Sequence, residues 1–154
     1  NKIEIIGHIK TVRFHTRTAV VIPSRITKEL VDILNKTKLK VVFVFHINHV
    51  REVSDEFMKN VESLKTHTLL NQSVLLKGVN DSAKVLSELS SKLFESNILP
   101  YYVHLLDKVS GADRFLVTDK RAKEIYKTLQ TLLPGYLVPR MVRDEGGYSK
   151  RLVL

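Results

Sequence analysis

Short apolar runs of strand character alternate with stretches of helical periodicity along most of this chain. Residues 41–45 form a continuous β-branched and aromatic run, and residues 69–76 and 99–106 are two further strand segments. Between them apolar residues recur at helical spacing, as in residues 86–93. Only a few residues connect each strand to the next helix, so successive strands are expected to run parallel through right-handed crossovers. The pattern predicts an α/β protein, and it leaves open whether the sheet is open and doubly wound or an arc of a β/α barrel.

The segments at the two ends of the chain are shorter and less regular. Residues 12–16 alternate between apolar and polar side chains, which favours a half-exposed strand. Residues 19–22 are typical of a short buried strand or extended run, ended by Pro23. Residues 137–142 form a last extended piece. At 154 residues the chain is long enough for one domain with a substantial core.

The chain is basic, with 25 Lys and Arg against 16 Asp and Glu and a formal charge of +9. Such an excess draws a protein toward anions such as phosphates, carboxylates or nucleic acid. The basic residues are scattered along the sequence, which favours a solvated basic surface and does not favour nucleic acid as a partner. No apolar run approaches the roughly 18 residues that span a bilayer. We therefore expect a soluble, cytoplasmic protein without a membrane partner.

The sequence contains no cysteine, so disulfides and cysteine-ligated metals or clusters are excluded within these 154 residues. His46 and His49 are closely spaced, but they fall in the turn after a strand and no third ligand accompanies them. We therefore expect no metal site. The first residue is Asn rather than an initiator Met, which indicates a fragment of a longer protein.

Polar side chains follow the predicted strands where each strand ends, which is where ligands bind in parallel α/β proteins. Each also has a purely structural interpretation: His46 as a core hydrogen-bonding group, Asn48 as a turn residue and Asp81 as a helix cap. The set comprises His46, Asn48 and His49, then Lys77, Asn80 and Asp81, and finally Asp107 and Lys108.

Lys150 follows a glycine-bearing stretch close to the end of the sequence. A lysine on such a loop can form a Schiff base with a carbonyl cofactor when its pKa is lowered. An exposed lysine without a role is the simpler interpretation.

Four segments resemble the lysine 2,3-aminomutase family of radical S-adenosylmethionine enzymes, in the order and spacing of that family. They read Arg13-Phe-His-Thr-Arg-Thr-Ala-Val-Val-Ile-Pro-Ser-Arg-Ile-Thr27, His46-Ile-Asn-His49, Asn71-Gln-Ser-Val-Leu-Leu-Lys-Gly-Val-Asn-Asp81 and Pro100-Tyr-Tyr102. The resemblance covers nearly the whole chain. Leu106-Asp-Lys-Val-Ser-Gly-Ala112 and Gly135-Tyr-Leu-Val-Pro-Arg140 are most similar to the branch that isomerises lysine for attachment to elongation factor P.

The resemblance implies an isomerase that converts α-lysine to β-lysine by radical 1,2-amino migration. It implies S-adenosylmethionine cleaved at an iron–sulfur cluster, pyridoxal phosphate as carrier of the nitrogen, and proteins of the elongation factor P pathway as partners. It also implies a fold: residues 1–134 as the C-terminal portion of a radical-SAM partial (β/α) barrel, and residues 135–154 as a segment that carries the pyridoxal phosphate lysine. The cluster cysteines belong upstream of this chain, so we expect the chain by itself to catalyse no aminomutase reaction.

Carried over residue by residue, the resemblance assigns site residues. Lys150 is the catalytic and cofactor-binding lysine that forms the Schiff base with pyridoxal phosphate. Asp107 and Asp144 hold the ammonium end of the substrate. The residues expected beside S-adenosylmethionine are His46, Asn48, Gln72 and Ser73.

Two other functions are compatible with the sequence. One is a non-catalytic module that binds pyridoxal phosphate or a protein partner. The other is a basic RNA-associated domain, which rests on charge alone because no RNP-like or Gly-x-x-Gly motif is present. A half barrel leaves a sheet edge and apolar faces uncovered, so self-association into a homo-oligomer is also expected.

Overall fold

The computed structural model describes residues 2–107, 111–143 and 151–152. Its strands form one sheet whose spatial order follows the chain, from β1 to β6. The first five strands pair in parallel, and β6 is antiparallel to β5. The strands are β1 (Thr11–Thr16), β2 (Lys40–His46), β3 (Thr68–Leu75), β4 (Leu99–Leu105), β5 (Arg140–Arg143) and β6 (Arg151–Leu152), and the α-helices are α1 (Thr18–Val21), α2 (Lys28–Lys36), α3 (Asp55–Val61), α4 (Ala83–Glu95) and α5 (Asp119–Leu132).

The four longer helices begin at hydroxyl side chains. In each, the oxygen of a Ser or Thr accepts a hydrogen bond from the backbone N–H three residues later, which satisfies one of the unpaired donors of the first turn. The capping residues are Thr27, Ser54, Ser82 and Thr118. Local sequence therefore fixes where each helix begins, and the apolar face of each helix then directs it onto the sheet.

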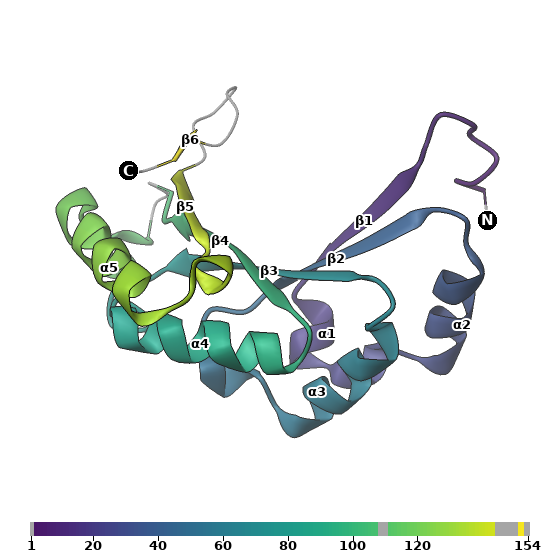
Figure 1. Cartoon of the computed structure of the whole chain (residues 1–154), viewed down its shortest axis with the longest axis horizontal. Helices are drawn as coiled ribbons and strands as arrows, with labels where there is room; N and C mark the ends of the chain where they lie inside the picture. The colour runs from purple at the N-terminus through teal and green to yellow at the C-terminus, as the bar shows by residue number, and fades with distance from the viewer. Residues whose placement is uncertain (1, 108–110, 144–150, 153–154) are drawn as a thin grey trace.

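The helices lie together on one side of the sheet, as Figure 1 shows. The core lies between them and the helix-side residues of the strands, in one cluster that includes Phe43, Phe45 and Phe57 and a second that includes Leu75 and Leu129. Within the described residues no helix is long and apolar enough to cross a membrane. The predicted α/β class, with a parallel sheet and outer helices, is confirmed. Its assignment to a radical-SAM barrel stays a prediction.

The opposite face of the sheet is not covered by any helix of the described chain (Figure 1). Paired positions of neighbouring parallel strands point to the same face. His46 pairs with Gln72, Gln72 with Tyr102, and Tyr102 with Arg140. One row of polar side chains therefore crosses four strands on the uncovered face, and we call these four residues the polar row.

The expectation for residues 19–22 was wrong in secondary structure. Residues Thr18–Val21 form a single helical turn, closed by the Ile22 N–H donating to the carbonyl of Thr18 at 2.8 Å. Ala19 and Val20 are buried in the core, as the apolar run indicated. Val21 and Ile22 are exposed, at 66% and 50%, so only the first half of the expected buried run is buried. The helical turn lets the chain reverse after β1 and enter α2.

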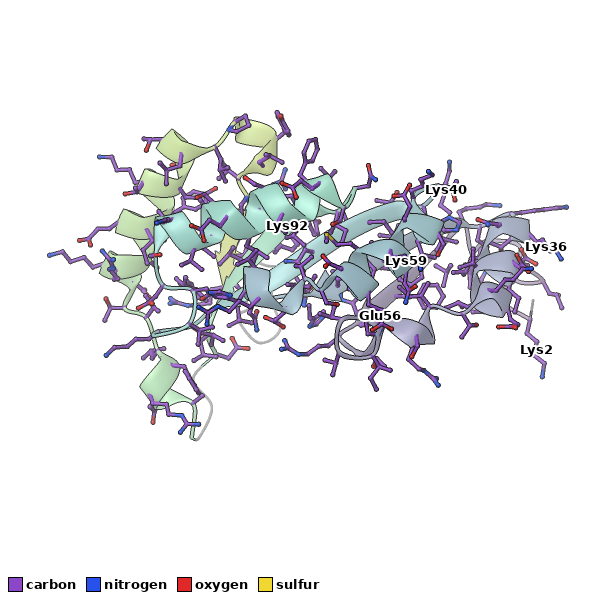
Figure 2. The ribbon with its side chains drawn as sticks, turned by 90° about the horizontal axis from the view of Figure 1, so that it is seen from below. Lys2, Lys36, Lys40, Glu56, Lys59 and Lys92 are labelled. Atoms are coloured by element: carbon purple, nitrogen blue, oxygen red, sulfur yellow. The ribbon has the colours of Figure 1, made fainter. Side chains whose placement is uncertain are left out.

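The basic side chains are spread over several elements, as the sequence indicated. Figure 2 shows the helix side of the molecule, with Lys36 at the end of α2, Lys40 at the start of β2, Lys59 on α3 and Lys92 on α4. Lys92 pairs with Glu95 at 3.0 Å on its own helix. An exposed pair of this kind contributes little to stability.

Candidate functional site

The ends of β2 and β3 are joined by the side chain of Asn80, which is completely buried. Its Oδ1 accepts a hydrogen bond from the Leu76 N–H at 2.7 Å, and its Nδ2 donates to the carbonyls of Asn48 and Val74, each at 2.9 Å. The Oδ1 of Asn48 in turn accepts from the Val74 N–H at 2.9 Å. Two asparagines thus hold the turns after two neighbouring strands in one fixed arrangement.

Asn71 makes a second buried link between the same strands. Its Oδ1 accepts from the Ile47 N–H at 2.9 Å, and its Nδ2 donates to the Ile47 carbonyl at 3.0 Å. The Asn71 amide replaces the missing strand partner of Ile47, so the backbone just beyond β2 is satisfied without water. This explains in physical terms why an amide residue stands at a buried position of β3.

Glu52 fixes the turn after β2 from the solvent side. Its Oε1 accepts hydrogen bonds from the N–H groups of Asn48 and His49, at 2.8 and 2.9 Å. Its Oε2 pairs with Arg17 at 2.7 Å, and Arg17 also donates to the His46 carbonyl at 3.4 Å. The turn is therefore anchored to the end of β1 as well, and the carboxyl ends of β1, β2 and β3 are held together.

His46 presents a polar atom that the protein leaves unsatisfied. Its Nε2 is buried and has no hydrogen-bond partner among the described residues. The ring lies edge-on to His15, with 6.0 Å between ring centroids. Burial, and secondarily the positive charge of Arg17, lower the pKa of His46 below its ordinary value. The imidazole is therefore neutral at pH 7.

The polar row continues from His46 to Gln72, Tyr102 and Arg140. A hydrogen bond with Tyr101 and, next, burial raise the pKa of Tyr102, while the positive charge of Arg140 lowers it. The Tyr102 ring also lies edge-on to His104, at 5.6 Å. Sequence reasoning missed Tyr102 and Arg140 as site residues. The two-residue spacing of Tyr102 and His104 predicts that both side chains lie on the same face of the strand. It does not predict which residues of the neighbouring strands lie beside them on that face.

The structure places the four residues predicted beside S-adenosylmethionine in different surroundings. His46 and Gln72 share the uncovered face. Ser73 points to the helix side, is 3% exposed, and donates to the Tyr102 carbonyl at 3.4 Å. The side chain of Asn48 is engaged with the Val74 backbone. The structure thus brings His46 and Gln72 together and gives Ser73 and Asn48 contacts that support the strands.

Asp107 lies just beyond β4, exposed to solvent. It lines a cavity of about 470 Å³ together with Thr118, Asp119 and Arg143. Arg143, the last residue of β5, donates to the Asp119 carboxylate at 3.1 and 2.5 Å, which closes one wall of the cavity. Asp144 and Lys150 lie outside the described residues. In the portions of the chain that are described, no group of three or more His, Asp or Glu side chains is arranged to hold a metal ion.

The lowered pKa of His46 predicts a pH effect on stability. An unfolded histidine has a pKa of about 6.5, so below that pH the unfolded chain binds more protons than the folded one. The free energy of unfolding therefore falls as the pH drops below about 6.5. Between about pH 7.5 and about pH 5.5, His46→Gln is expected to lose less stability than the unchanged protein, measured by urea unfolding.

The matched control for this measurement is His8→Gln, which replaces an exposed histidine. It should keep the pH dependence of the unchanged protein. Equal pH dependences of the His46→Gln and His8→Gln variants would contradict the inference from burial.

No family model matches the sequence, but several curated proteins do. The chain is 54% identical to the L-lysine 2,3-aminomutase of Haemophilus influenzae, over 94% of this chain and 44% of the relative. It is 48% identical to that of Buchnera aphidicola, over 100% of this chain and 46% of the relative, and 47% identical to that of Escherichia coli, over 99% and 45%. The chain thus spans about half the length of these relatives. It belongs to the family of proteins named L-lysine 2,3-aminomutase.

Proposed function

We propose that this chain is a portion of a lysine 2,3-aminomutase-like isomerase, which converts α-lysine to β-lysine by moving an amino group between neighbouring carbons. The observation that carries the proposal is the 47–54% identity to three proteins of that name over nearly all of this chain. Because the chain spans less than half of each relative, the activity belongs to a longer polypeptide or to an assembly. The elongation factor P pathway is the proposed destination of the product.

The described residues fit some of the proposed cofactor set. The imidazole of His46 and the amide of Gln72 occupy paired positions on the uncovered face, where polar side chains suit a polar ligand such as S-adenosylmethionine. The chain has no cysteine, so the iron–sulfur cluster requires thiolates from outside these residues. When bound, S-adenosylmethionine and the cluster supply the radical, and pyridoxal phosphate carries the nitrogen.

This chain's own residues have binding and orienting roles in the proposal. The Asp107 carboxylate, on the wall of the cavity beyond β4, attracts the ammonium group of lysine. Asp144 and Lys150 are proposed to complete that site, in the segment of residues 135–154 that follows the barrel segment of residues 1–134. Asn48, Asn71 and Asn80 hold the strand ends so that ligand-binding groups keep their spacing. Ser73 supports β4 from the helix side.

The proposal is tested by locating the reactive lysine. Pyridoxal phosphate is added to the purified chain, the Schiff base is trapped with borohydride, and peptides are mapped by mass spectrometry. We expect the label to be concentrated on Lys150 and to be lost in Lys150→Ala. The reason is that a cofactor-binding site directs pyridoxal phosphate to one lysine, whereas exposed lysines react without preference. The matched control is Lys127→Ala, which removes an exposed lysine of α5 and should leave the labelling unchanged.

Label spread over many lysines would contradict the assignment of Lys150 in this chain. The same preparation should form no β-lysine from α-lysine and S-adenosylmethionine, because three thiolates are needed to hold the cluster. Detectable β-lysine from this chain alone would contradict the fragment proposal.

A further inference from the structure

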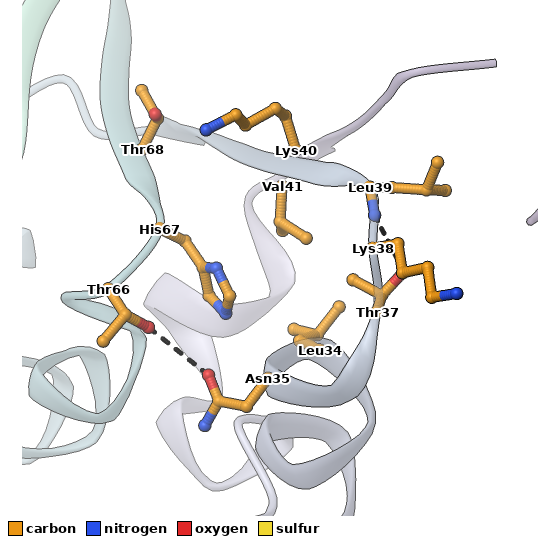
Figure 3. A pocket seen from close by; sticks show the side chains of 10 residues that line it. All are labelled: Leu34, Asn35, Thr37, Lys38, Leu39, Lys40, Val41, Thr66, His67 and Thr68. Carbon is orange, nitrogen blue, oxygen red and sulfur yellow. Dashed lines mark hydrogen bonds between the residues drawn. The ribbon is translucent and has the colours of Figure 1, made fainter.

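Cavities at the two ends of the strands differ in how their polar groups are placed. The cavity at the amino ends of β2 and β3 has a volume of about 580 Å³. Figure 3 shows Lys40 and His67 extending to opposite sides of these strands, so its polar groups do not converge. The cavity beyond the carboxyl end of β4, of about 470 Å³, is lined by three charged side chains, those of Asp107, Asp119 and Arg143.

The charged groups that line the cavity beyond β4 carry one net negative charge, from two carboxylates and one guanidinium. Arg143 is bonded to Asp119 through two hydrogen bonds, at 3.1 and 2.5 Å, so their charges compensate each other. Among the described residues Asp107 has no hydrogen bond or ion pair. The charge of the cavity is therefore that of the Asp107 carboxylate, which is accessible to a ligand.

Asp119 is well placed to hold Arg143. It is the first residue of α5, and the amino end of a helix favours a negative charge. Two N–H···O bonds to one carboxylate fix the orientation of a guanidinium as well as its position. The two side chains are 35% and 56% exposed, and an exposed pair of this kind contributes little to stability. The main consequence of the pair is therefore where it holds the guanidinium.

Arg143 and Asp107 follow neighbouring parallel strands. His104 of β4 pairs with Val142 of β5, so Arg143 is one residue beyond that pair and Asp107 is three residues beyond it. Paired strands lie about 4.8 Å apart, and the side chain of arginine is long. A guanidinium released from Asp119 can therefore turn toward Asp107, the other carboxylate of the same cavity. The charges of Arg143 and Asp107 would then cancel.

We propose that Asp119 is a positioning residue, which holds Arg143 away from Asp107 and so keeps the Asp107 carboxylate available to an ammonium group. The inference rests on the proposed function, in which Asp107 attracts the ammonium group of lysine. It adds that the preference of the cavity for a cation depends on an ion pair beside the binding carboxylate. A cavity with a net negative charge attracts a cation, and a cavity in which Arg143 neutralises Asp107 does not.

The first test follows the NMR signal of the Arg143 Nε–H group in the purified, isotope-labelled chain. Asp107→Asn should leave this signal in place when Asp119 is present, because Arg143 is then paired with Asp119. In the Asp119→Asn background the same change should shift the signal, because Arg143 is then paired with Asp107. Asp113→Asn removes an exposed carboxylate that does not line the cavity, and it should leave the signal unchanged in both backgrounds. Equal effects of Asp107→Asn in the two backgrounds would overturn the proposal.

The second test measures the binding of L-lysine to the same chain by calorimetry. Asp119→Asn should weaken binding about tenfold, the scale of losing one contact that involves a charge. Removing the competing guanidinium as well, by combining Asp119→Asn with Arg143→Gln, should restore the Kd to within about threefold of that of the unchanged chain.

This recovery separates positioning from a purely structural role. If the ion pair only anchored α5, the double variant would bind lysine no better than Asp119→Asn, and that result would overturn the proposal. Absence of lysine binding by the unchanged chain would instead count against the proposed role of Asp107, and the Arg143 signal would still decide whether Asp119 holds the guanidinium away from it.

Discussion

Replacing Phe45 with alanine is expected to lower the free energy of unfolding by about 4 kcal/mol, the largest effect of any single change proposed for this protein. Phe45 lies near the carboxyl end of β2, between β1 and β3, and is completely buried. Its ring stacks on Phe43 at 5.8 Å and meets Phe57 of α3 edge-on at 5.3 Å. Truncation removes both ring contacts and leaves a cavity where α3 meets the sheet. Urea unfolding followed by circular dichroism measures the change.

Two further variants make this result interpretable if Phe45→Ala does not fold. Phe45→Leu keeps most of the buried volume and should cost about 1.5 kcal/mol. Phe94→Ala removes the same side chain from α4 at a position that is 45% exposed, and it should cost well under half as much as Phe45→Ala. Equal losses for Phe45→Ala and Phe94→Ala would show that the core is not organised around β2 and α3.

The second large effect is expected for Asn80→Ala, at about 3 kcal/mol. The Asn80 side chain satisfies three backbone groups in a site with no exposed surface. Alanine leaves the Leu76 N–H and the carbonyls of Asn48 and Val74 without that partner, and water cannot replace it without opening the structure. The loss should appear both in urea unfolding and in faster amide hydrogen exchange at the ends of β2 and β3.

Asn80→Asp separates hydrogen bonding from shape. The aspartate keeps the acceptor for Leu76, but it places a second oxygen against the two carbonyls that the amide now serves. Its pKa is expected to rise, so the variant should be least stable at neutral pH and should regain stability as the pH falls. Asn35→Ala, at an exposed position, is the matched control and should change stability by no more than about 0.5 kcal/mol. A similarly small effect of Asn80→Ala would contradict the inferred role.

Local sequence determined the elements, because the signals for them lie within a few residues. Ser and Thr caps begin the four longer helices, and the continuous apolar run of residues 41–45 forms most of β2. The likeness to the aminomutase family was also readable from segments such as 71–81, and the comparison with curated proteins supports it. The exception is Thr18–Val21, where a short apolar run does not distinguish a strand from a helical turn, and where only Ala19 and Val20 are buried.

Only the tertiary structure decided which polar residues stand together. His46, Gln72, Tyr102 and Arg140 come from four strands, and their alignment depends on a register shift between Asn71 and Gln72 where β3 meets β4. Gln72 and Ser73 are neighbours in sequence yet face opposite sides of the sheet, because successive side chains of a strand alternate. Register and facing are set by hydrogen bonds and packing between segments far apart in the chain, which a local pattern does not contain.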